Sequence, residues 1–186
     1  MIYFVDNFLS PSLLNNFLED QSQFITFPTS GKTFWVRPSY EEFDNYVIER
    51  ISKIEQRKIK NILSFFREAK EGQDDEWRIH NDSIINGEQP DRTIVLYMQS
   101  EESKELNGTA FWEHKKYGEV YKESGYQEDE KDLIEGSNKI EDFTLKSIIG
   151  YKQNRLLSYP SNYYHSKYPR EFKEPRRVFV MFYKIL

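Results

Sequence analysis

The sequence predicts an α+β protein with a mainly β core, in which helical segments come first and an antiparallel series of strands follows. Up to Gly72, apolar residues recur at roughly helical spacing. After Gly72, short runs rich in β-branched and aromatic residues alternate with turn residues. Because no helix of comparable strength lies between most of these runs, they favour a sheet sandwich or barrel with helices packed on one face.

The length favours a single domain over residues 1–186, with a helical support region over residues 1–72 and a β-barrel core over residues 73–186. A chain of 186 residues is long enough to bury a full core without disulfides or a structural metal. It contains no cysteine, which excludes disulfides and thiolate metal sites and suits a reducing compartment. The sequence leaves the oligomeric state open.

Charge and hydropathy limit the classes of partner. A net charge of −5, with 31% charged residues, gives no general attraction to nucleic acid and argues against it as a partner. No window approaches the roughly 18 apolar residues of a membrane span. The opening "MIYFVDNFLSPSLLNNFLED" lacks the basic and apolar regions of a signal peptide. We therefore expect a soluble, cytoplasmic protein with no membrane partner.

The first 72 residues predict two strands and two helices. "IYFVDNF" has the composition of a short strand, and a helix from Pro11 to Glu19 follows with Ser10 as its N-cap. "KTFWVRP" predicts a strand that ends at Pro38, and Ser39 with Glu42 forms a capping-box pattern at the start of a long helical stretch. The apolar face of that stretch is predicted to be core rather than a partner groove; its residues are Phe43, Val47, Ile51, Ile54, Ile62 and Phe66.

The remaining chain predicts five strands and one insertion. The strand-like runs are "EWRIHND", "RTIVLYMQ", "GTAFWEHK", "RLLSYP" and "RRVFVMFYKIL". The stretch over about residues 117–149 is acidic and interrupted by glycines, so it is predicted to be an insertion in the strand series. It is either a lid facing the substrate or a solvated decoration.

The candidate site starts from the triplet His80-Asn81-Asp82 at the end of a predicted strand. In a strand, His80 and Asp82 point to the same face, about 7 Å apart, close enough to ligate one ion together. On their own they are better interpreted as a solvated strand end. His165, which follows another strand near the C-terminus, adds a second imidazole and favours a metal site; the third histidine, His114, is predicted to lie at the surface or behind the site.

Two imidazoles and one carboxylate on one face of an octahedral ion leave three positions open, as in non-haem Fe(II) oxygenases. The open positions can take a chelating 2-oxoacid and O₂. The far carboxylate of such a co-substrate needs a fork-shaped donor, which an arginine 11 or 12 residues after His165 would supply. The candidates are Arg176 and Arg177.

The chain resembles the Fe(II)- and 2-oxoglutarate-dependent dioxygenases, in particular their prolyl-hydroxylase-like branch. The resemblance covers most of the chain and rests on the order of several segments: "IYFVDNFLSPSLLNNFLE", "RIHND", "RTIVLYMQ", "NGTAFWEHK", "NRLLSYPSNYYHS" and "RRVFVMFY". It implies a double-stranded β-helix core, of the jelly-roll or cupin-like type, with the N-terminal helices packed on one sheet. The Gly-Gly often found before the third core strand is Asn107-Gly108 here, and the acidic insertion has no counterpart.

Carried over by residue, the resemblance implies that His80, Asp82 and His165 are the iron ligands and that Tyr97 contacts the far carboxylate of 2-oxoglutarate. Arg177 is favoured as the carboxylate-binding arginine. If Arg177 faces the interior, Phe179, Met181 and Tyr183 share its side, and the alternate residues face the helices. If Arg176 faces inward instead, Arg177 points toward the helix-covered face, where an unpaired charge is costly.

The implied activity is oxidation of a substrate C–H bond, most simply hydroxylation, coupled to decarboxylation of 2-oxoglutarate to succinate, with ascorbate as a supporting reductant. Two alternatives remain: a catalytically silent binding module of the same fold, and a cupin-like metalloenzyme that does not use 2-oxoglutarate. The substrate, a protein side chain or a small molecule, is not identified by the sequence. The acidic insertion favours a cationic or neutral substrate over a polyanion.

Overall fold

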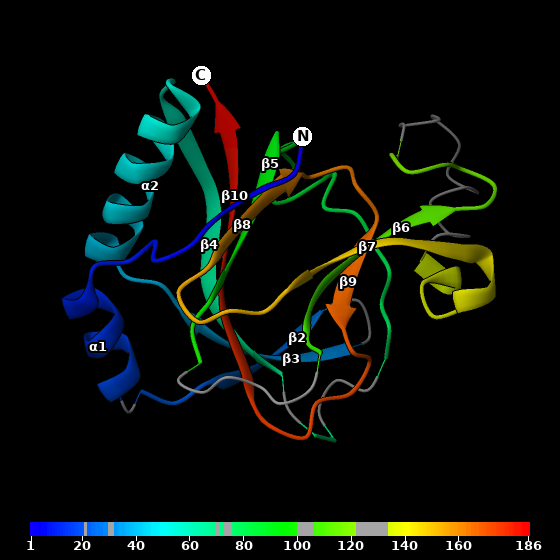
Figure 1. The fold of residues 1–186 in the computed structure, drawn as a ribbon, viewed down its shortest axis with the longest axis horizontal. Coiled ribbons are helices and arrows are strands. Elements are labelled where there is room, and N and C mark those ends of the chain that lie inside the picture. Colours follow the sequence, from blue (N-terminus) through cyan, green and yellow to red (C-terminus); the bar gives the residue numbers. More distant parts are fainter. Residues whose placement is uncertain (21, 30–31, 70, 73–75, 100–105, 122–133) are drawn as a thin grey trace.

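The computed structural model describes residues 1–20, 22–29, 32–69, 71–72, 76–99, 106–121 and 134–186. Two antiparallel sheets form its core, and helices cover one of them (Figure 1). No helix in these ranges is long and apolar enough to cross a membrane. In chain order, the elements are β1 (Tyr3–Val5), α1 (Pro11–Glu19), β2 (Ile25–Thr29), β3 (Lys32–Pro38), α2 (Glu41–Glu55), β4 (Ile59–Ala69), β5 (Arg92–Tyr97), β6 (Gly108–His114), η1 (Ile140–Asp142), β7 (Phe143–Gly150), β8 (Leu156–Pro160), β9 (His165–Tyr168) and β10 (Arg176–Ile185).

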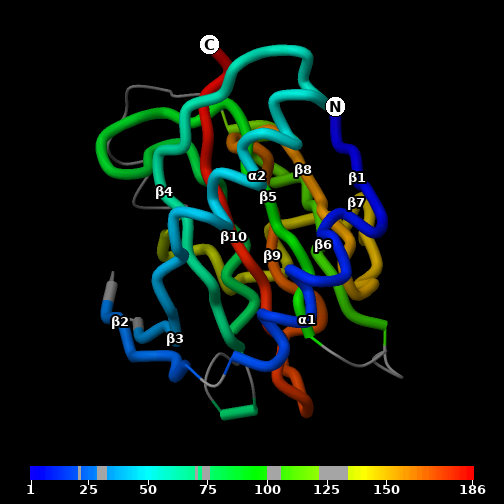
Figure 2. The backbone as a smooth tube through the Cα atoms, turned by 90° about the vertical axis from the view of Figure 1, so that its left-hand side faces the viewer, coloured from blue at the N-terminus to red at the C-terminus, as the bar shows by residue number. Residues whose placement is uncertain are grey.

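The larger sheet has seven strands in the order β1-β8-β5-β10-β4-β3-β2, and the smaller has three in the order β7-β6-β9. The C-terminal strand β10 therefore lies at the centre of the larger sheet, between β5 and β4. The smaller sheet packs on the inner face of the larger one, where Phe111 of β6 joins a cluster with Val95, Tyr97 and Leu157. α1 and α2 lie across the other face (Figure 2).

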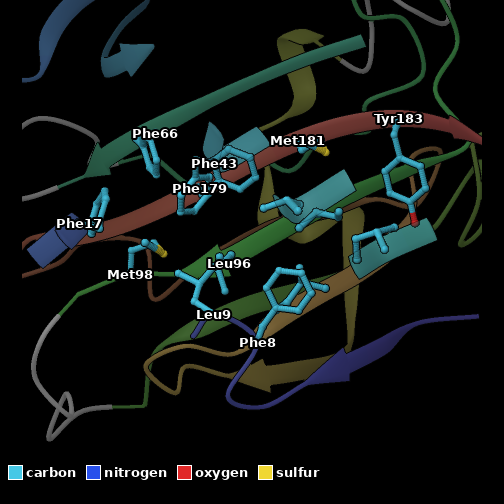
Figure 3. Packing of buried hydrophobic residues seen from close by; sticks show 14 of the residues in the cluster. Phe8, Leu9, Phe17, Phe43, Phe66, Leu96, Met98, Phe179, Met181 and Tyr183 are labelled. Atoms are coloured by element: carbon cyan, nitrogen blue, oxygen red, sulfur yellow. The ribbon is translucent and has the colours of Figure 1, made fainter. Parts of the chain in front are cut away.

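Strand β10 shows which face of the larger sheet the helices cover. Phe179, Met181 and Tyr183 pack into the helix-side cluster with Phe17 of α1 and Phe43 of α2 (Figure 3). The alternate residues of β10 lie in the cluster between the two sheets; they are Val178, Val180 and Phe182. This orientation is the reverse of the predicted one, so the assignment of the two faces of β10 is wrong.

The first helix agrees with the prediction, whereas the second is shorter than predicted. α1 runs from Pro11 to Glu19, and the Ser10 side chain accepts a hydrogen bond from the Leu13 N–H at 3.3 Å. α2 has no side-chain N-cap, and Ser39 Oγ donates instead to Asp44 Oδ2, so the predicted capping box is wrong. The helix ends at Glu55, and Gln56 follows in a left-handed conformation with φ of 55°.

Residues Ile59–Ala69 form strand β4, and the helix predicted through Phe66 is wrong there. A spacing of four residues, as between Ile62 and Phe66, fits both a helical turn and two strand repeats, so the pattern alone does not separate them. Pairing with β10 along the whole length of β4 decides the outcome. The region over residues 1–72, predicted to be helical, contributes four strands to the larger sheet.

Most strands predicted in the second part of the chain are confirmed as β5, β6, β8 and β10. The strand predicted around His80 is wrong, because His80 forms only an isolated bridge with His165. β2 was not predicted. The end of the predicted insertion forms η1 and β7, which pairs with β6, so the insertion is shorter than expected. Its acidic run "QEDEKD" lies outside the described residues.

Replacing Phe43 with alanine is expected to lower the free energy of unfolding by about 3–5 kcal/mol, because the surrounding rings cannot collapse into the cavity. Phe43 is 0% exposed, and its ring centroid lies 5.1 Å from that of Phe66 and 4.9 Å from that of Phe179. Urea unfolding measures the change. The control is Phe27→Ala, at a position that is 55% exposed, where about 0.5 kcal/mol or less is expected. Equal losses in the two variants would contradict this packing.

Candidate metal centre

His80, Asp82 and His165 come together although 85 residues separate the two histidines. The ligand atoms of the three side chains all lie within 4.8 Å of one another. The backbone brings them together: the His80 N–H donates to the His165 carbonyl at 3.0 Å, and the His165 N–H donates back at 2.8 Å. This reciprocal pair places the two imidazoles side by side, with ring centroids 4.4 Å apart.

Both imidazoles are oriented by backbone carbonyls. The Nδ1 of His80 lies 2.7 Å from the Arg78 carbonyl oxygen, and the Nδ1 of His165 lies 3.0 Å from the Tyr163 carbonyl oxygen. Since a carbonyl can only accept, each Nδ1 carries a proton, and Nε2 is the ring nitrogen that remains to face a metal. Two Nε2 atoms with fixed ring orientations are what a metal-binding histidine pair requires.

The Asp82 carboxylate lies between the two imidazoles. Its Oδ1 is 3.6 Å from His80 Nε2, and its Oδ2 is 3.4 Å from His165 Nε2. Thr93 Oγ1 donates a buried hydrogen bond to Oδ2 at 2.8 Å, which fixes the plane of the carboxylate. The Asp82 N–H donates to the Ser161 carbonyl at 2.7 Å, so the backbone is fixed as well.

Burial sets the charge preference of this group. It raises the pKa of Asp82, against smaller opposing effects of His165, Thr93 and nearby arginines. It also lowers the pKa of His80 well below the usual value, helped by the neighbouring His165. The pocket thus disfavours an isolated carboxylate and holds His80 neutral. A divalent cation would supply the positive charge that a buried carboxylate needs, so the three residues fit a metal ion of the kind bound by nitrogen and oxygen donors.

The Thr93→Val substitution keeps the side-chain shape and removes the hydroxyl that donates to Asp82. Because hydrogen bonds that orient metal ligands affect affinity, we expect Fe(II) to bind about tenfold more weakly. Anaerobic titration with Fe(II) measures the change. Thr144→Val, at an exposed threonine of β7, is the matched control and is expected to bind Fe(II) like the unmodified protein. An unchanged affinity in Thr93→Val would show that Thr93 does not position the carboxylate.

The two arginines of β10 lie on opposite faces of the sheet, and the expectation that Arg177 faces the interior is wrong. Arg177 Nε donates to Glu68 Oε2 at 2.9 Å, and its side chain is 44% exposed. It lines a cavity of about 320 Å³ on the helix-covered side of the sheet, with Phe17, Phe24, Trp35 and Arg37 among the other lining residues. The charge on that face is therefore paired and partly solvated, which removes the cost on which the prediction relied.

Arg176 faces the interior between the two sheets. Its guanidinium carbon lies 5.4 Å from the ring centroid of Tyr97, and its Nη2 donates to the Gly108 carbonyl at 3.3 Å. Burial lowers the pKa of Arg176, and among the described residues no carboxylate pairs with it. Its Nε is buried with no hydrogen-bond partner in the described structure. A buried guanidinium with a spare donor indicates a site for an anionic group.

Tyr97 lies beside Arg176, on the same inner face of the larger sheet. Its side chain is 0% exposed, and its hydroxyl forms a hydrogen bond of 2.9 Å with Thr109 Oγ1. Burial raises the pKa of Tyr97, so the hydroxyl stays protonated and can donate. Tyr159, whose ring centroid is 4.7 Å from that of His165, lines the same interior. Thr93 and Tyr159 were not singled out from the sequence; their inward position in β5 and β8 is the only signal that could have indicated them.

His114 and Asn81 lie outside the metal-ligand group. The Nδ1 of His114 accepts from the backbone N–H groups of Lys116 and Tyr117, which stabilises a turn at the end of β6. The Asn81 Oδ1 accepts from the Ser83 N–H at 3.1 Å, so its side chain shapes the turn that follows the ligands. Both positions agree with roles outside the metal-ligand group.

Comparison with known proteins identifies the fold. No protein-family model and no curated protein sequence matches the chain. Solved structures do match. The carbocyclase SnoK from nogalamycin biosynthesis, non-heme and α-ketoglutarate-dependent, superimposes with a TM-score of 0.66 at 10% identity, over 98% of this chain and 78% of SnoK. HygX from Streptomyces hygroscopicus, with nickel and 2-oxoglutarate bound, gives 0.60 at 8% identity, over 98% and 82%.

The viral collagen prolyl hydroxylase vCPH from Paramecium bursaria Chlorella virus-1, in its 2-oxoglutarate complex, gives a TM-score of 0.54 at 11% identity, over 98% of this chain and 94% of vCPH. The chain therefore has the fold of 2-oxoglutarate-dependent oxygenases across nearly its whole length. At these identities the likeness establishes the fold, and the chemistry has to be argued from the site.

Proposed function

We propose that the protein is an Fe(II)- and 2-oxoglutarate-dependent oxygenase whose two facing sheets form a double-stranded β-helix. The observation that carries the proposal is the pairing of two features between the same sheets. One is a group of two imidazoles and a carboxylate; the other is the buried Arg176, which has a spare donor and no carboxylate partner among the described residues. Both features fit a metal with a dicarboxylate co-substrate.

Each residue has a defined role in this proposal. His80, Asp82 and His165 would hold Fe(II) through two imidazole nitrogens and one carboxylate. Arg176 binds the far carboxylate of 2-oxoglutarate, and the Tyr97 hydroxyl donates to it, beside Thr109. When bound, the metal and co-substrate supply the oxidising power, through decarboxylation of 2-oxoglutarate to succinate. The protein's part is to fix the ligands, neutralise the far carboxylate and exclude water.

Hydroxylation of a C–H bond is the simplest outcome, and the matched structures also include an epimerase and a carbocyclase. One HygX structure contains hygromycin B, and vCPH is described as a collagen prolyl hydroxylase. Among proteins of this fold, HygX thus has a small-molecule ligand, and vCPH is named for a protein substrate. Either class fits the proposal for this chain.

Succinate release tests the proposal. The purified protein is incubated with Fe(II), 2-oxoglutarate and ascorbate, and succinate is measured with and without the metal. We expect slow, Fe(II)-dependent release even without substrate, together with Fe(II)-dependent binding of 2-oxoglutarate. A protein that neither releases succinate nor binds 2-oxoglutarate would not be an oxygenase of this type. Metal binding alone would then favour the cupin-like alternative, and its absence the silent binding module.

A further inference from the structure

Two arginines contact one aromatic ring near the metal-ligand group. The guanidinium carbon of Arg78 lies 4.0 Å from the ring centroid of Phe34, and that of Arg67 lies 4.7 Å from it. Both distances are within the range of cation–π contacts. The ring therefore orients two guanidinium groups toward one region, and all three residues are partly exposed, so a ligand can reach them.

The strand register places Arg67 on the inner face of the larger sheet. Arg67 of β4 is opposite Val178 of β10, and Val178 is in turn opposite Tyr97 of β5. Since residues directly opposite in a sheet point to the same face, Arg67 shares the face of Tyr97. On its other side, Arg67 is opposite Val36 of β3, two residues after Phe34.

Arg78 is tied to the metal-ligand group through the backbone. It precedes His80 by two residues, and its carbonyl is the group that orients the His80 ring. Arg78 has a φ of 48°, a left-handed conformation that is unfavourable for a long side chain. The Asn138 side chain holds this conformation by accepting from the Arg78 N–H at 3.0 Å. Strained residues of this kind cluster at binding sites.

We propose that Arg67 and Arg78, with Phe34 between them, bind an anionic group of the substrate, a carboxylate or a phosphate, beside the metal. The inference rests on the proposed function and extends it to the class of substrate. Guanidinium groups bind both oxyanions in a forked geometry. Arg78 lies two residues before His80 and orients its ring through the backbone, and the Phe34 ring joins Arg67 to Arg78. A substrate anchored here would lie within reach of the ligand group.

This inference differs from the preference drawn from the acidic insertion, which favoured a cationic or neutral substrate. That preference was drawn from the acidic insertion over about residues 117–149, whose run "QEDEKD" lies outside the described residues. The residues that the structure places around the metal-ligand group include two arginines, and local charge governs which substrate group is held there.

The test uses the protein loaded with Zn(II), as a diamagnetic substitute for Fe(II), and with 2-oxoglutarate. Binding of 2-oxoglutarate is measured first, without any other added anion. Its absence would count against the proposed function, independently of the result for the two arginines. Acetate, its neutral isostere acetamide, and inorganic phosphate are then titrated while the arginine side-chain N–H signals are followed by NMR. The variants are Arg67→Gln and Arg78→Gln, and the control is Arg57→Gln, which removes the same charge at an exposed position next to α2.

We expect acetate or phosphate, and not acetamide, to shift the signals of Arg67 and Arg78. Anion affinity is expected to fall about tenfold in each variant, as for the loss of a charge-assisted hydrogen bond, and to stay unchanged in the control. Preference for phosphate would indicate a phosphorylated substrate, and preference for acetate a carboxylate. The proposal is overturned if neither anion shifts these signals or if both variants keep full anion affinity. A tenfold loss of 2-oxoglutarate affinity in the variants would also overturn it, by assigning the arginines to the co-substrate.

Discussion

Asp82→Ala is expected to abolish Fe(II)-dependent succinate release, whereas Asn81→Ala is expected to retain it. Asp82 is the only carboxylate in the described metal-ligand group, and alanine leaves two imidazoles and no anionic ligand. Removing it also leaves Thr93 without its acceptor. Succinate release and anaerobic Fe(II) titration measure both losses.

The neighbouring residue provides the control. The Asn81 side chain accepts hydrogen bonds only from Ser83 in the described structure, so Asn81→Ala is expected to cost about 1 kcal/mol of stability and little activity. Thermal unfolding separates this cost from a catalytic one. Equal loss of succinate release in the two variants would contradict the proposed ligand geometry.

Arg176→Met and Arg177→Met are expected to have opposite effects, although the two residues are adjacent. Arg176→Met should weaken 2-oxoglutarate binding about a hundredfold, because it removes the positive partner of a buried carboxylate. In the absence of co-substrate it should leave the protein as stable as before or more so. It replaces a buried guanidinium, which has an unbonded Nε and no carboxylate partner within the described part of the chain, by an apolar side chain of similar length. Calorimetric titration and thermal unfolding measure the two effects.

Arg177→Met should leave 2-oxoglutarate binding unchanged and lower the free energy of unfolding by about 1–2 kcal/mol. It removes the ion pair with Glu68, whose side chain is only 7% exposed. The two variants therefore distinguish the expected role of Arg176 in 2-oxoglutarate binding from the expected role of Arg177 in stability. If Arg177→Met weakens 2-oxoglutarate binding as much as Arg176→Met, the assignment of Arg176 is wrong.

The sequence singles out His80, Asp82 and His165, which the structure brings together, because their chemistry is visible in the residue types. Their role as metal ligands stays a prediction. Histidines are rare in this chain, and a His-x-Asp followed by a distant histidine and a pair of arginines has few other interpretations. The sequence does not predict which arginine faces inward. Both faces of β10 are apolar, so alternation alone cannot identify the helix-covered one. The deciding contact, between Arg177 and Glu68, joins strands that are distant in sequence.

The sequence also does not predict what the segment after the acidic run contacts, for a similar reason. Ser137 and Asn138 look like polar loop residues in the sequence, yet the Ser137 carbonyl accepts from the Ile79 N–H at 2.8 Å, and Asn138 holds Arg78. The role of such residues depends on which backbone they meet, and periodicity carries no information about that. This part of the predicted insertion supports the segment that carries His80.

The backbone bridge between His80 and His165 has a consequence for how the protein would gain and lose its metal. The two N–H···O bonds join backbone atoms and use none of the three ligand side chains. Removal of the metal would therefore leave the donor atoms in register, and uptake would require no rearrangement of the chain. The folded backbone alone would then keep the two histidines at the positions needed to bind the metal again.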